Sequence, residues 1–84
     1  MQKEAFFPAE LWQDLPHITL TGGQLLHIEQ HHGMVSYQPN QIVFDTSRGT
    51  LTVMGESLHV RKYTSTEAQL VGQIDAVLLK EQEG

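Results

Sequence analysis

Apolar and polar side chains alternate along residues 18–29, ITLTGGQLLHIE, in two short runs that meet at a pair of glycines. The apolar positions of the two runs are Ile18, Leu20, Leu26 and Ile28. A side-chain period of two is typical of a β-strand with one buried face, and a Gly-Gly pair between such runs is typical of a turn. The stretch therefore predicts two short strands joined at Gly22 and Gly23.

The same alternation recurs along the rest of the chain. It is found at Ile42 and Phe44, at Leu51 and Val53, at Leu58 and Val60, and from Leu70 to Leu78. Glycines separate many of these runs, and we expect structural turns at Gly22, Gly33, Gly49, Gly55 and Gly72. The pattern predicts an all-β fold of about six short antiparallel strands, in a small sandwich or a partly open barrel. A short β-solenoid is the alternative, because it shares the alternation and the glycine turns.

The chain divides into three segments by composition. Residues 1–16 form a lead-in rich in aromatic side chains, residues 17–80 form a single β domain, and residues 81–84 form a polar tail. A short helical turn is predicted between Pro8 and Leu15, since proline favours a first helical position and Pro16 ends the segment.

The composition argues against several classes of partner. The net charge is -5 with the histidines neutral, and the five Lys and Arg residues form no basic patch, so phosphate backbones and anionic lipids are repelled. The absence of cysteine excludes disulfides and thiolate metal sites. No apolar run reaches the roughly 20 residues that a spanning helix needs. We expect a soluble chain without nucleic-acid binding, membrane insertion or signal-peptide export.

No set of residues predicts catalysis. The sequence has no cysteine nucleophile and no serine in a Gly-x-Ser-x-Gly frame. Carboxylates are expected mostly on outward strand positions or in turns, at Glu29, Asp45, Glu56, Glu67 and Asp75. We therefore expect that the protein is not an enzyme.

The histidines include one close group, His27, His31 and His32. On a helix the first two would share a face, but on a strand residues four apart are separated by about 13 Å, too far for one metal ion. His31 and His32 are expected at a turn before Gly33. We expect no metal and no cofactor. A small-ligand or metal-binding module built from the histidines around His31 remains the alternative function.

Two regions of the sequence predict association. The final strand is apolar on both faces near its end, which a strand with one solvated face avoids, and aromatic residues gather near the N-terminus. The candidate interaction residues are Phe6, Phe7, Trp12, Met34, Tyr37, Val77 and Leu79. Packing of the N-terminal segment over the sheet of the same chain would account for part of this pattern as well.

The order of these segments resembles the YabP/YqfC family of sporulation proteins, and its YqfC members most closely. The resemblance runs from Phe7 onward through DLPHITLTG, LLHIEQHHGM, DTSRGTLTVMGESLHVRKY and LVGQIDAVLL. Gln30 stands where the family usually has asparagine, which fits left-handed turns better than glutamine does. The longer basic amphipathic segment with which many members begin has no counterpart in this sequence.

The resemblance implies a non-enzymatic part in endospore formation. It places the protein in the cytoplasm of the mother cell, peripheral to the forespore membrane through a partner, and it makes the membrane protein YqfD a candidate partner. Together with the apolar chain ends, it leads us to expect a protein that binds a partner or assembles into a homo-oligomer.

Overall fold

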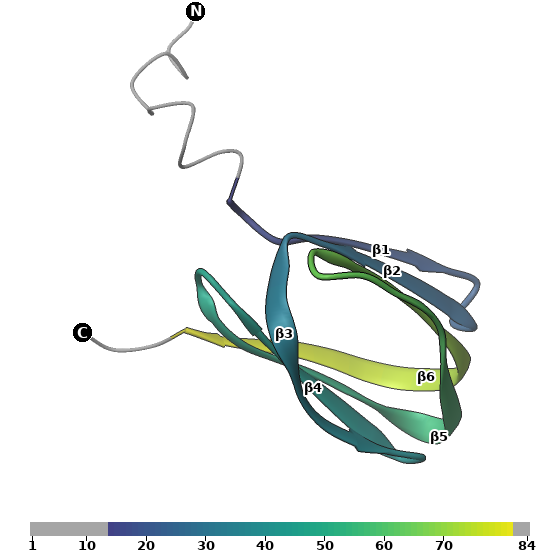
Figure 1. The fold of residues 1–84 in the computed structure, drawn as a ribbon. Helices are drawn as coiled ribbons and strands as arrows, with labels where there is room; N and C mark the ends of the chain where they lie inside the picture. The colour runs from purple at the N-terminus through teal and green to yellow at the C-terminus, as the bar shows by residue number, and fades with distance from the viewer. Residues whose placement is uncertain (1–13, 82–84) are drawn as a thin grey trace, which may run out of the picture.

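The computed structural model describes residues 14–81, whose regular structure is entirely β-strand (Figure 1). The strands are β1 (His17–Thr21), β2 (Leu25–Glu29), β3 (His31–Gln38), β4 (Gln41–Thr46), β5 (Gly49–Tyr63) and β6 (Glu67–Glu81). They form one sheet in the order β1-β2-β6-β5-β4-β3 with antiparallel neighbours throughout. The prediction of an all-β fold with about six antiparallel strands is confirmed. Antiparallel pairing rules out the solenoid. Most of the predicted helical turn lies outside the described residues.

Two long bent strands fold this sheet over on itself. β5 and β6 have 15 residues each, against 5 to 8 in the other strands. The β1–β2 half of the sheet contains residues 59–63 of β5 and 67–71 of β6, and the β3–β4 half contains 49–54 of β5 and 76–81 of β6. In Figure 1 both strands curve between these halves. The result is a partly open barrel.

The bend depends on two glycines at which β5 and β6 press together. A Cβ atom on Gly55 would lie 1.9 Å from the Gln73 carbonyl oxygen, and one on Gly72 would lie 2.6 Å from the Ser57 carbonyl oxygen. Side chains are therefore excluded at both points, and the ladder shifts register beside them. Gly55 and Gly72 thus lie within strands, as Gly33 does, and the expectation of turns at these three positions was wrong.

The core consists of the inward positions of the alternating runs. Its residues are Leu26, Ile28, Ile42, Phe44, Leu51, Val53, Leu58, Ala68, Leu70 and Ile74. They come from β2, β4, β5 and β6, so both halves of the sheet contribute one face to the same interior. Each large aliphatic side chain contributes about 1.5–3 kcal/mol through its burial.

His31 belongs to this interior, which corrects its expected place at a turn. Its side chain is 1% exposed, and its ring stacks on Tyr63 and lies against Phe44, with both centroids 5.1 Å away. Nδ1 accepts the Gly33 N–H at 2.9 Å, so Nε2 carries the proton of the neutral ring and finds no partner among residues 14–81. The turn falls one residue earlier, at Gln30, whose φ is 68°.

Candidate functional site

The predicted interaction residues fall in separate parts of the chain. Phe6, Phe7 and Trp12 lie outside the described residues. Met34 and Tyr37 are on β3, whereas Val77 and Leu79 are on β6, and in the order of the sheet two strands, β4 and β5, separate β3 from β6. The structure therefore does not unite these candidates into one surface.

On β3 the candidates take part in contacts within the chain. The Tyr37 hydroxyl accepts the backbone N–H of Val60 at 3.3 Å, and the Tyr63 hydroxyl accepts that of Met34 at 3.3 Å. Each tyrosine thus reaches from one strand edge to the backbone of the other, where β3 and the last part of β5 form no ladder. The two contacts close this side of the barrel and occupy donors that a partner strand would otherwise need.

Residues 76–81 of β6, called the β6 tail, are paired differently from residues 67–71 of the same strand. β2 pairs with β6 only at residues 67–71, and the last backbone contact on that side is the Ile74 N–H donating to the Gly23 carbonyl oxygen at 2.9 Å. Beyond it, the strands of residues 14–81 pair with the β6 tail on its β5 side alone. No strand of the described residues pairs with the opposite edge of the tail (Figure 1).

From Ala76 to Leu79 the β6 tail is apolar on both faces, and the charged residues Lys80 and Glu81 end it. Leu78 pairs with Thr52 and points to the outer face, where it is 55% exposed, while Leu79 pairs with Leu51 and points to the core face, where it is 42% exposed. Val77, also on the core face, is half-buried against the core. Open strand edges in soluble proteins usually carry charges or bulges that discourage pairing, and Ala76–Leu79 carries no charge.

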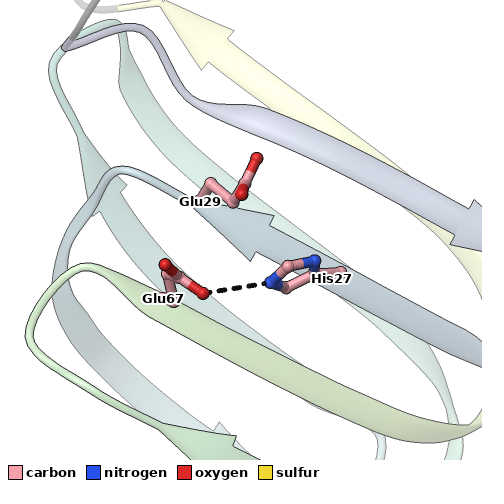
Figure 2. Close-up of side chains that lie close together, drawn as sticks. All are labelled: His27, Glu29 and Glu67. Atoms are coloured by element: carbon pink, nitrogen blue, oxygen red, sulfur yellow. Dashed lines mark hydrogen bonds and ion pairs between the residues drawn. The ribbon is translucent and has the colours of Figure 1, made fainter.

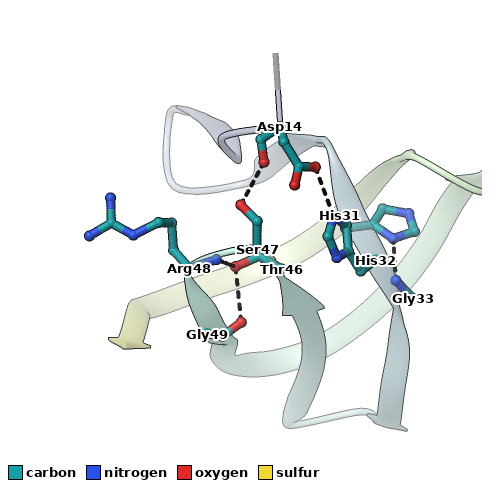
Figure 3. Close-up of polar contacts among 8 residues, drawn as sticks. All are labelled: Asp14, His31, His32, Gly33, Thr46, Ser47, Arg48 and Gly49. Atoms are coloured by element: carbon teal, nitrogen blue, oxygen red, sulfur yellow. Dashed lines mark hydrogen bonds and ion pairs between the residues drawn. The ribbon is translucent and has the colours of Figure 1, made fainter. Parts of the chain in front are cut away.

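The end of the lead-in is fixed near the β4–β5 turn (Figure 3). Asp14 accepts a hydrogen bond from the Ser47 hydroxyl at its carbonyl oxygen, at 2.6 Å, and its carboxylate lies 2.8 Å from His32 Nε2. Arg48 in the same turn pairs with Glu81, the last residue of the β6 tail. This polar network connects the lead-in, β3, the turn and the β6 tail.

A second polar cluster lies on the outer face of the β1–β2 half (Figure 2). It consists of His27 and Glu29 on β2 and Glu67 on β6, all half-buried. His27 Nε2 lies 3.4 Å from a Glu67 carboxylate oxygen, and one ligand atom from each of the three side chains lies within 4.8 Å of the others. Imidazole and carboxylate groups gathered this closely can bind a divalent cation.

Strand pairing fixes the positions of the three side chains. Glu29 pairs directly with Glu67, and His27 is two residues along β2, so all three project from one face. His17 on β1 pairs with Glu29 and projects from the same face. His31 and His32, by contrast, are engaged by Gly33 and Asp14, so the histidines around His31 do not form a ligand set in the described structure.

Only part of this cluster could be predicted from the sequence. The spacing of His27 and Glu29 places them on one face of a strand, whereas Glu67 was expected only at an outward strand position or in a turn. Their meeting depends on the pairing of β2 with β6, which no local pattern specifies.

The fold and its surfaces define a small all-β protein with a partly open barrel, an apolar strand end in β6 that pairs on one side only within residues 14–81, and a polar cluster outside the core. No helix within residues 14–81 is long and apolar enough to cross a membrane.

The chain belongs to the YabP family, whose model matches residues 14–84. It is similar to the uncharacterized protein YqfC of Bacillus subtilis (strain 168), with 29% identity over 70 residues that cover 83% of this chain and 75% of that protein. The family resemblance of the sequence is thereby confirmed, and family membership indicates a sporulation-related protein.

Proposed function

We propose that this chain is a non-enzymatic sporulation protein that assembles with further copies of itself through the β6 tail. One observation carries the proposal: Leu78 and Leu79 are exposed on opposite faces of a strand end whose second edge pairs with no strand of residues 14–81. An added strand would satisfy the open backbone groups and cover both leucines at once, as in β-strand addition.

A two-fold arrangement fits the sequence of the β6 tail. If two tails pair antiparallel about Leu78, each Leu78 faces its copy, and Val77 faces Leu79 of the second chain on the core side. Residues that pair directly lie on the same face of a sheet, so this register joins outer face to outer face and core face to core face. The same register sets Asp75 opposite Glu81 of the second chain. The Arg48 side chain of that second chain offsets the charge of Glu81.

The cellular setting of the proposal comes from the family. We further propose, as the resemblance implies, that the protein acts in the mother-cell cytoplasm, next to the forespore membrane, with a membrane protein such as YqfD as a further partner. A self-assembled protein would present several copies of the same surface to that partner, which strengthens weak individual contacts.

Multi-angle light scattering at micromolar concentration, with the wild-type chain and two variants, tests the assembly. We expect the wild type to be a dimer or larger and Leu78→Glu to be a monomer, because the change buries a charge at the centre of the paired edge. Leu20→Glu is the matched control, since Leu20 is 48% exposed and lies on β1, the edge strand on the far side of β2. A wild-type monomer would contradict the proposal, and so would an oligomer that only Leu20→Glu dissociates.

A further inference from the structure

We propose that His27, Glu29 and Glu67 form a binding site for a divalent transition-metal ion of the zinc class. The site is separate from the β6 tail, because it lies on the outer face of the other half of the sheet. It also differs from the histidine group that the sequence suggested, of which only His27 takes part.

The spacing of the ligand atoms suits zinc. Zinc binds imidazole nitrogen and carboxylate oxygen at about 2.0–2.2 Å in tetrahedral geometry, so two ligand atoms of one ion lie about 3.4 Å apart. His27 Nε2 and the Glu67 carboxylate oxygen are already 3.4 Å apart. The Glu29 oxygen lies within 4.8 Å of both, a separation that a rotation of its flexible side chain can close.

The electrostatics of the apo cluster favour a cation. Glu29 and Glu67 carry like charges at directly paired positions of neighbouring strands, an arrangement that destabilises a sheet. A neutral His27 donates at most one hydrogen bond to this pair and adds no positive charge. A divalent ion would balance both carboxylates. All three side chains are half-buried, so the ion would be partly shielded from water.

The donor set selects among cations. Magnesium and calcium prefer sites made of oxygen ligands alone, whereas an imidazole nitrogen favours zinc and its neighbours among the transition metals. Three protein ligands leave a fourth position for water or another donor, as in open zinc sites. His17 is next to Glu29 in the sheet, because the two residues pair directly.

The backbone holds the site in place before any metal binds. β2 lies between β1 and β6 in the sheet, and the positions of His27 and Glu29 are paired on both sides. The inward-facing neighbours Leu26 and Ile28 are fully buried. Their burial fixes the outward direction of His27, which lies between them, and of Glu29, which follows Ile28. Ligands on rigid strands need little reorganisation to bind an ion.

Titration of the tag-free full chain with zinc chloride, followed by calorimetry and by thermal melting, tests the site. We expect one zinc ion per chain and a rise in melting temperature of about 10 °C when free zinc is 100 times Kd. His27→Ala and Glu67→Gln should weaken zinc binding at least about tenfold. His32→Ala and His59→Ala, which change exposed histidines elsewhere, should leave the affinity for zinc unchanged.

Glu29→Gln separates a metal site from a merely structural cluster. In the presence of a chelator the change should raise the melting temperature, because it removes the like-charge pair, whereas its affinity for zinc should fall. The proposal is overturned if the wild type binds no zinc, if His27→Ala binds zinc as the wild type does, or if magnesium raises the melting temperature as much as zinc. Melting each variant with chelator shows beforehand that it is folded.

Discussion

Gln30 adopts a backbone conformation that costs most residues free energy. Its φ of 68° is left-handed, and its N–H donates to the Thr66 carbonyl oxygen at 2.7 Å, so the turn between β2 and β3 is held in this form. A residue other than glycine loses about 1–2 kcal/mol in this region, and asparagine tolerates it better than glutamine.

We therefore expect Gln30→Asn to stabilise the protein by about 0.5 kcal/mol, a rise in melting temperature of about 2–4 °C. Gln38→Asn, on an exposed position of β3, is the control and should be neutral or destabilising, because strands disfavour asparagine. Thermal melting by circular dichroism measures both. Equal effects of the two changes would show that the left-handed turn contributes nothing.

At the scale of the element, the bend of β5 against β6 holds the two halves of the sheet together. Gly55→Ala should destabilise the fold by about 2 kcal/mol or more, because the new Cβ would overlap the Gln73 carbonyl oxygen and force the strands apart. The expected fall in melting temperature is about 10 °C. Gly22→Ala is the control: the φ of Gly22 is left-handed, at 60°, and no atom lies within 4 Å of the added Cβ.

The control should cost only about 1 kcal/mol, from backbone strain alone. Chemical denaturation of both variants gives the comparison directly. If Gly55→Ala costs no more than Gly22→Ala, the close contact at the bend is not what shapes β5 and β6.

Local sequence determined more of the strands than of their arrangement. The period of two correctly placed Leu26 and Ile28 in the core and His27 on the outer face, because successive side chains on a strand point to opposite faces of the sheet. Glycine permits a turn, a bulge or a close approach alike, so Gly55 and Gly72 could not be recognised as bends within strands. Which of these applies depends on backbone that is distant in sequence.

The candidate sites, like the fold, could be predicted only in part from local sequence. The apolar residues on both faces near Leu79 predicted an unusual strand end from composition alone. The edge of this strand end that is unpaired within residues 14–81 could not be predicted. It arises because β2 pairs only with residues 67–71 of β6 and does not extend along residues 76–81. The position of Glu67 beside His27 has the same origin. Pairings between distant strands are set by the packing of the whole core, and no window of sequence contains them.

At the scale of the whole molecule, the barrel has been closed by two tyrosines on one side and left open along the β6 tail on another. The two tyrosine contacts thus protect one pair of edges, whereas the β6 tail pairs with no second strand of residues 14–81 and can accept a strand from a second chain. Assembly through the β6 tail would engage the backbone amides of its second edge in hydrogen bonds with a second chain.

Hydrogen exchange, measured by mass spectrometry at a low and a high protein concentration, tests whether the β6 tail pairs with a second chain. We predict that peptides covering residues 76–81 exchange more slowly at the high concentration in the wild type and not in Leu78→Glu, because pairing with a second chain protects the open edge. Peptides from β4, which is paired on both sides, should not change. Exchange in the β6 tail that is independent of concentration would contradict the account.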